Sequence, residues 1–201
     1  MIVVDIETSG MDFVKCGIWQ IGAVDLETME EFLEEGRIDD DEQIISEGKR
    51  TVFEVTGKTE KELKDKLKQS QKQLITNFLK WVEKRQSNNF ICQNPQFDHA
   101  FISVKARKYG LKIPFHYRAF DLHSIANIKY FQIHNKFLEK EGKSDMGLRN
   151  ILSFVGMRDE RGIHNALEDS KLTAECFSRL VHGKSLLKEY KKYPIPDYLK
   201  Q

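Results

Sequence analysis

The sequence has few cysteines and prolines and no long apolar segment. Its three cysteines, Cys16, Cys92 and Cys176, are widely spaced and form no CxxC pair or Cys/His cluster. They therefore predict neither a disulfide framework nor a zinc site, and they fit a reducing compartment. No apolar run approaches the ~20 residues of a membrane-spanning helix, and the N-terminus lacks a charged leader with a long apolar core. We expect a soluble intracellular protein, cytoplasmic or nuclear, without a membrane partner.

An excess of charge of either sign is also absent. The chain holds 32 Lys and Arg against 31 Asp and Glu, for a formal net charge of +1, which neither favours nor excludes a polyanionic partner. The charges are unevenly distributed, because residues 25–47 are densely acidic whereas residues 103–118 and the C-terminal segment are basic. A polyanion is expected to approach the two basic regions and to avoid the acidic one. The alternative is that each run is only a solvated face.

The sequence does contain enough apolar material for one domain. With 201 residues and 40% hydrophobic content, we expect a single globular unit. Strands are expected at about residues 1–10 (ending in a turn), 17–26, 29–38, 89–92 and 118–122, and helices at about 59–85, 97–109, 122–138, 147–156 and 166–181. Short connections make the first three strands antiparallel neighbours, with the acidic third strand at the edge. Strands followed by interleaved helices predict an α/β domain with a mixed sheet.

Two carboxylates end the first strand. Asp5 and Glu7 are two residues apart in MIVVDIETSG, so they point to the same face of the strand. At roughly 4 Å and an effective dielectric constant of about 20, two such charges repel by about 4 kcal/mol. A cation, a shared proton or full solvation must relieve this repulsion, and carboxylate oxygens are the ligands that Mg²⁺ and Mn²⁺ prefer. The alternative is a strand that simply ends in water.

A second polar pair, His164 and Asp169, lies near the end of the chain. On a continuous helix a separation of five residues puts two side chains about 140° apart around the axis. The pair converges only if His164 lies on the loop before the helix and Asp169 lies on its first turns. Gly162 permits such an approach of the loop. The alternative is a histidine that caps the helix or lies on the surface.

Three motifs together resemble those of a known family. DIETSG at residues 5–10, NPQFD at residues 94–98 and HNALED at residues 164–169 are similar, in order and separation, to the three exonuclease motifs of the DEDDh (DnaQ-like) 3'-5' exonucleases. The resemblance covers residues 1–182. It implies an RNase H-like α/β fold, with a central five-stranded mixed sheet whose first three strands are antiparallel, flanked by helices. Residues 183–201 then form a basic C-terminal tail, which we expect to pack on this exonuclease domain.

The resemblance implies a catalytic role for five residues. Asp5, Glu7, Asp98 and Asp169 match the carboxylates that coordinate two divalent cations, Mg²⁺ or Mn²⁺. His164 matches the general base, which also contacts the substrate. The residues themselves point the same way, because four anions brought together from separate segments repel one another unless a metal is present.

Substrate contacts are also implied. Glu7, together with backbone groups of Thr8 and Ser9, is expected to recognise the terminal 3' hydroxyl, which makes the enzyme exo-acting. Met11 and Phe97 are candidates to stack on the last bases of a single strand. The alternative for both residues is ordinary core packing.

The implied reaction is hydrolysis of the terminal phosphodiester of single-stranded DNA or RNA with a free 3' end, which releases nucleoside 5'-monophosphates. DNA and RNA are not distinguished by these residues. A catalytically silent nucleic-acid-binding module, a polymerase-associated subunit and a hydrolase of small nucleotides are the alternatives, and a homodimer is possible because some relatives form one. Two segments depart from the family pattern, Gln93 in place of a frequent His and EVTGKT at residues 54–59. They concern the substrate and not the reaction.

Overall fold

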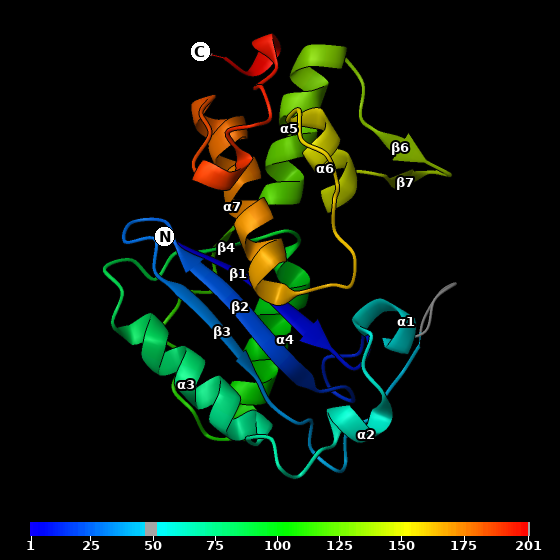
Figure 1. Ribbon diagram of the computed structural model, residues 1–201, viewed down its shortest axis with the longest axis vertical. Coiled ribbons are helices and arrows are strands. Elements are labelled where there is room, and N and C mark those ends of the chain that lie inside the picture. The colour runs from blue at the N-terminus through cyan, green and yellow to red at the C-terminus, as the bar shows by residue number, and fades with distance from the viewer. Residues whose placement is uncertain (47–51, 201) are drawn as a thin grey trace.

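The centre of the protein is a five-stranded sheet with helices on both faces (Figure 1). The computed structural model describes residues 1–46 and 52–200. The strands are β1 (Ile2–Thr8), β2 (Ile18–Asp25), β3 (Glu31–Glu35), β4 (Phe90–Cys92) and β5 (Ala119–Asp121). In the order β3-β2-β1-β4-β5, β2 is antiparallel to β1 and β3, whereas β4 is parallel to β1 and β5. The predicted mixed sheet, with its first three strands antiparallel and β3 at the edge, is confirmed.

Two groups of helices cover the sheet. The helices are α1 (Val52–Thr56), α2 (Glu60–Leu63), α3 (Gln71–Glu83), α4 (Pro95–Lys108), α5 (Leu122–His134), α6 (Leu148–Phe154) and α7 (Ala166–His182). The described residues also form a hairpin of β6 (Glu139–Lys140) and β7 (Lys143–Ser144), and two 3₁₀ turns, Lys188–Tyr190 and Asp197–Leu199. The even-numbered apolar residues of β1 pack against α3 and α4, whereas Val3 packs on the side of α5, α6 and α7. Because side chains alternate along a strand, Asp5 and Glu7 share the face of Val3. Within the described ranges, no helix combines the length and apolar character needed to cross a bilayer.

The prediction of a single helix over residues 59–85 is wrong, because the chain forms α2, then a non-helical stretch, then α3. The predicted capping box of Thr59 and Glu62 is present, but it caps only the short α2. Between the two helices the apolar side chain of Leu67 is 96% exposed, so no apolar face holds this stretch on the core. Ser70 then begins α3 as a new N-cap.

The connection predicted to be irregular over residues 39–58 is partly helical, since it contains α1. Gly57, with φ of +65°, ends α1 in the left-handed conformation that glycine adopts readily. Residues 47–51, which include Gly48 of the predicted connection, lie outside the described residues.

The acidic and basic stretches pair with each other instead of staying apart. Lys105 Nζ of α4 lies 2.7 Å from Glu42 Oε1, and both side chains are almost fully buried. Lys108 Nζ lies 2.9 Å from Asp39 Oδ2 and 3.3 Å from Asp41 Oδ1. These two lysines therefore fix the acidic loop against α4, and the expectation that residues 103–118 attract a polyanion stays a prediction.

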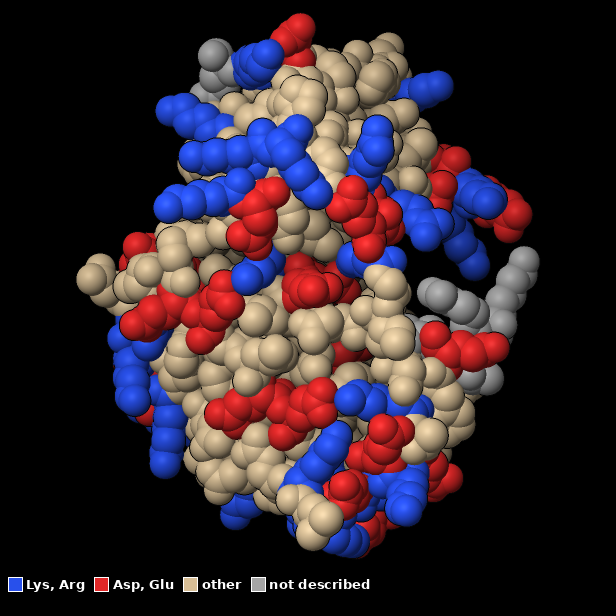
Figure 2. Space-filling model, in the orientation of Figure 1, with Lys and Arg blue, Asp and Glu red and all other residues tan. Residues whose placement is uncertain are grey.

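The C-terminal segment packs on α7 around a buried ion pair. Arg179 Nε lies 2.7 Å from Glu175 Oε1, and both side chains are fully buried. The other oxygen of Glu175 accepts two backbone N–H groups from residues 186–187, at 2.8 Å each. Arg179 also donates to the carbonyl oxygens of Tyr190 and Tyr193. Figure 2 shows that Lys and Arg side chains gather on the surface over this part of the molecule.

Replacing Glu175 by Gln is expected to lower the free energy of unfolding by about 3–5 kcal/mol, because Arg179 then stays buried without its counterion. Urea unfolding followed by circular dichroism measures this loss. As the control, Glu160→Gln removes the exposed Lys192–Glu160 pair, whose side chains are each 59% exposed, and is expected to change little. Equal small effects of the two substitutions would contradict the assigned role of the buried pair.

Candidate active site

The end of β1 is fixed by a turn at Ser9 and Gly10. Ser9 Oγ accepts the N–H of Gly17 at 2.9 Å and donates to the carbonyl oxygen of Gln43 at 2.6 Å. The backbone N–H of Ser9 donates to the carbonyl oxygen of Gly17, and its carbonyl oxygen accepts from Ile45. Gly10 has φ of +152°, and a Cβ at this position would lie 2.7 Å from the carbonyl oxygen of Ile45. Ser9 thus uses its donors within the fold and holds the turn together.

The start of α7 approaches β2 closely enough to bring Asp169 to β1. A Cβ at Gly22 would lie 2.1 Å from the backbone of Ala166, so this approach requires glycine. Gln20 Oε1 accepts the N–H of Ala166 at 2.8 Å, and Asn165 caps the helix with its side chain. These contacts explain why the polar Gln20 lies among the apolar residues of β2.

His164 lies on the loop directly before α7, as the spacing predicts. Its Nδ1 is 3.2 Å from Asp169 Oδ2. Together with Glu7, these two residues offer ligand atoms that all lie within 4.8 Å of one another. The predicted convergence of the first and third motifs is therefore present in the structure.

Asp98 comes from the first turn of α4. Asn94 precedes the helix in the left-handed conformation, with φ of 75°, and Pro95 begins it. Asp98 Oδ1 accepts the N–H of Ile6 at 3.2 Å. Asp98 is only 4% exposed and lies beneath the end of β1.

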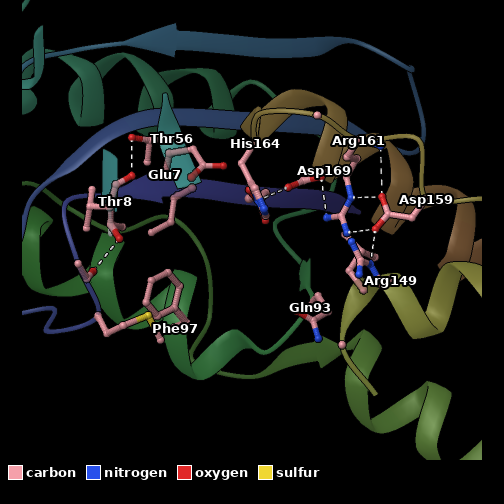
Figure 3. A pocket seen from close by; sticks show the side chains of 18 of the residues that line it. Glu7, Thr8, Thr56, Gln93, Phe97, Arg149, Asp159, Arg161, His164 and Asp169 are labelled. Carbon is pink, nitrogen blue, oxygen red and sulfur yellow. Dashed lines mark hydrogen bonds and ion pairs between the residues drawn. The ribbon is translucent and has the colours of Figure 1, made fainter. Parts of the chain in front are cut away.

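A single cavity of about 800 Å³ lies over these residues (Figure 3). Of the predicted site residues, it is lined by Asp5, Glu7, Thr8, Met11, Phe97, His164 and Asp169, but not by Ser9 or Asp98. Met11 is 57% exposed at its rim. Phe97 faces the cavity and also packs on the core, with its ring centroid 4.8 Å from that of Phe101.

The carboxylates repel one another inside the fold. Burial, and then the charges of Asp98 and Asp169, raises the pKa of Asp5 well above its ordinary value. Burial raises the pKa of Glu7 to about 7, and burial likewise raises that of Asp98 to about 7. The hydrogen bond with Asp169 raises the pKa of His164. A divalent cation would relieve the repulsion, and this donor set of carboxylate oxygens beside one imidazole fits Mg²⁺ or Mn²⁺.

Further polar residues of the cavity wall were not predicted. Three of them are charged and come from α6 and the loop before His164: Arg149, Asp159 and Arg161. The only signal of Asp159 and Arg161 in the sequence is the charged run RDERG at residues 158–162, which is also typical of a solvated loop, and Arg149 has no such signal. Gln93 and Thr56, from the two segments that depart from the family pattern, line the cavity as well.

Replacing Asp98 by Asn is expected to stabilise the metal-free protein above pH 7. Burial raises the pKa of Asp98 from 3.8 to about 7, so the folded state binds this proton more tightly than the unfolded state. The stabilisation from that proton is complete below about pH 4 and is lost as the pH rises through about 7. The neutral amide avoids the loss, which we expect to be on the order of 2 kcal/mol.

Thermal unfolding in EDTA at pH 5 and pH 8 measures this effect. The wild type should lose stability between the two values, and Asp98→Asn should lose less. Glu139→Gln, at an exposed position of β6, serves as the control. An Asp98→Asn protein that is less stable than the wild type at pH 8 would refute the assigned cost of the buried charge.

Comparisons with known proteins agree with this geometry. No curated protein matches the chain. Residues 1–181 match the sequence model of one protein family, which is described as the 3'-5' exoribonuclease Rv2179c-like domain. Among solved structures, the nuclease domain of 3'hExo, a DEDDh family member bound to rAMP, is similar with a TM-score of 0.66 and 17% identity over 93% of this chain and 94% of that chain.

Two larger proteins share the same fold. Cell-death related nuclease 4 is similar with a TM-score of 0.69 and 14% identity, over 92% of this chain and 64% of its own. The E. coli ExoI–ssDNA complex is similar with a TM-score of 0.70 and 14% identity, over 91% of this chain and 41% of its own. The chain thus covers most of one compact nuclease domain and a smaller part of these longer proteins. It belongs to the Rv2179c-like 3'-5' exoribonuclease domain family, and it is a 3'-5' exonuclease with an RNase H-like fold.

Proposed function

We propose that this exonuclease hydrolyses the terminal phosphodiester of single-stranded RNA or DNA at a free 3' end and releases nucleoside 5'-monophosphates. The observation that carries the proposal is the convergence of Asp5, Glu7, His164 and Asp169, from β1 and the start of α7, around one cavity, with Asp98 of α4 buried directly beneath the end of β1. RNA is the substrate class we favour, because the family description names an exoribonuclease.

Asp5, Glu7, Asp98 and Asp169 are the residues that would hold two divalent cations, Mg²⁺ or Mn²⁺. Such ions would lower the pKa of the attacking water and stabilise the leaving 3' oxygen. The raised pKa values of Asp5, Glu7 and Asp98 support this assignment, because they indicate a site whose negative charge is only partly balanced by the protein.

His164 would accept the proton of the attacking water. Its Nδ1 lies against Asp169 Oδ2, which fixes the ring and leaves Nε2 for proton transfer. The carboxylate also raises the pKa of the imidazole, which makes it a stronger base. A positioned base of this kind contributes about 10²–10⁴-fold to a reaction rate.

Glu7 and Thr8 would recognise the terminal 3' hydroxyl at the end of β1. Phe97 and Met11 line the same cavity and would stack on or wedge beside the last bases. In Figure 3, Thr8 and Phe97 lie on one side of the cavity and Arg149 on the other. Ser9 would act indirectly, by holding the turn that presents Thr8.

The C-terminal segment would be part of the folded domain. Residues 1–182 would form the exonuclease domain, and residues 183–201 would complete its fold, which the contacts of Glu175 and Arg179 with that segment support.

The cysteines bear on the cellular compartment. All three are free and buried, which supports the proposed reducing, intracellular compartment.

Two substitutions separate metal binding from proton transfer. Asp5→Ala is expected to abolish both Mn²⁺ binding and hydrolysis, because it removes a ligand at the centre of the site. His164→Ala is expected to lower kcat by about 10²–10⁴-fold while leaving most Mn²⁺ binding intact. Isothermal titration and a nuclease assay measure the two quantities, with Asp197→Ala, at a 95% exposed side chain, as the control. Wild-type activity in Asp5→Ala would eliminate the assignment.

The direction of degradation tests the rest of the proposal. A single-stranded RNA labelled at its 5' end should shorten stepwise from the 3' end in Mg²⁺ or Mn²⁺, and EDTA should stop the reaction. The matched DNA should be degraded more slowly, and a 3' phosphate should block both strands because Glu7 and Thr8 would lose the hydroxyl they recognise. Internal cleavage, or degradation of the blocked strand at the same rate, would contradict the proposed end recognition.

A further inference from the structure

Arg161 is held rigidly in the wall of the cavity. Its Nε donates to Asp159 Oδ1 at 2.8 Å and its Nη2 donates to Asp159 Oδ2 at 3.0 Å, so the two planar groups face each other (Figure 3). The side chains of Arg161 and Asp159 are only 15% and 14% exposed. Two parallel hydrogen bonds of this kind fix the orientation of a guanidinium as well as its position.

The remaining nitrogen of this guanidinium, Nη1, contacts the candidate metal ligand Asp169. Arg161 Nη1 donates to Asp169 Oδ1 at 3.1 Å, while Asp169 Oδ2 lies 3.2 Å from His164 Nδ1. Both oxygens of Asp169 therefore have a partner within the protein. A cation held by Asp169 would compete with Arg161 for this carboxylate, whereas Asp159 would still hold Arg161 through Nε and Nη2.

If Asp169 no longer accepted this hydrogen bond, Arg161 Nη1 would face the cavity without an acceptor, because Asp159 is bonded to Nε and Nη2. A guanidinium left in that state binds phosphate oxygens well, because its flat fork of donors matches them. Arg149 Nε also lies 3.2 Å from Asp159 Oδ2, and its side chain is 82% exposed. This wall of the cavity thus carries two guanidinium groups against one carboxylate, Asp159, and it complements a polyanion entering a cavity whose floor is acidic.

We propose that Arg161 changes its hydrogen-bond partner during the reaction cycle. It donates to Asp169 in the metal-free protein, and it would bind the terminal phosphodiester of the substrate when Asp169 holds a cation. Asp159 is the positioning residue that keeps the guanidinium in place through the exchange. This inference rests on the proposed exonuclease function, and it adds a phosphate contact and a competitor for the metal to that site. A purely structural role, in which Arg161 only ties residues 159–161 to α7, predicts neither property.

The first test is binding of Mn²⁺ alone, which requires no nucleic acid. Arg161→Gln is expected to bind Mn²⁺ several-fold more tightly than the wild type in isothermal titration, because the competitor for Asp169 is gone. Arg158→Gln removes the same charge three residues away at an exposed position outside the cavity, and it should change Mn²⁺ affinity less than two-fold. Equal affinities of the wild type and Arg161→Gln would overturn the exchange.

The second test is binding of RNA in Ca²⁺, measured by fluorescence anisotropy. One oligonucleotide has an ordinary terminal phosphodiester, and the other has an uncharged methylphosphonate at that linkage. The wild type should bind the charged strand about ten-fold more tightly, and Arg161→Gln should lose this preference. The slope of log Kd against log salt for the charged strand should also fall by about 0.7 in Arg161→Gln, as expected for one phosphate contact on a single strand.

The double variant Asp159→Asn with Arg161→Gln tests the positioning role. If Asp159 acts only through Arg161, the double variant should bind RNA no more weakly than Arg161→Gln alone. A retained preference for the phosphodiester in Arg161→Gln, with an unchanged salt slope, would overturn the phosphate contact. Failure of the wild type to degrade either nucleic acid would instead count against the proposed function, and the Mn²⁺ measurement would still decide the competition at Asp169.

Discussion

The repulsion between buried carboxylates is the constraint on which the rest of this structure depends. Asp5 and Glu7 share one face of β1, Asp98 lies beneath them, and Asp169 approaches from α7. Burial disfavours the charged form of Asp5, Glu7 and Asp98 and raises the pKa of each, and the neighbouring carboxylates raise the pKa values of Asp5 and Glu7 further. A fold that contains such a cluster must hold it in place by contacts elsewhere, and a cation that binds the cluster would stabilise the folded state.

Those contacts join segments that are far apart in the sequence. Gly22 lets the start of α7 meet β2, and Gln20 fixes the first N–H of the helix there. Ser9 joins the end of β1 to two neighbouring loops. At the far end of α7, the buried pair of Glu175 and Arg179 binds the C-terminal segment. The helix that carries Asp169 is thus fastened at both ends, which keeps the carboxylate close to the strand despite the repulsion.

The parts of the fold that follow from local rules could be predicted from the sequence. The alternation along β1 placed Asp5 and Glu7 on one face, and the spacing of His164 and Asp169 placed the histidine before the helix. The break between α2 and α3 could not be predicted this way, because Leu63 and Leu67 fit a helical spacing although Leu67 is almost fully exposed. Whether an apolar residue reaches the core is decided by the tertiary fold.

The same limit applies to charged residues. Lys105 is indistinguishable in the sequence from its exposed neighbours, yet it is buried against Glu42. Arg161 and Asp159 lie in a charged run with no helical or strand periodicity, and only the path of the loop brings them to Asp169. Ser9 was predicted as a substrate contact, but its backbone and hydroxyl groups are used in the turn. Long-range contacts of this kind are set by topology and not by spacing along the chain.

The most direct test of the central claim is the thermal unfolding midpoint of the protein as a function of Mn²⁺ concentration at pH 8. If the carboxylates form a cation site, the midpoint should rise steadily with Mn²⁺, since an ion that binds only the folded state stabilises it by RT ln(1 + [L]/Kd), about 2.7 kcal/mol at 100 times Kd. The rise should disappear in Asp5→Ala. A midpoint that does not move with Mn²⁺ in the wild type would contradict the account.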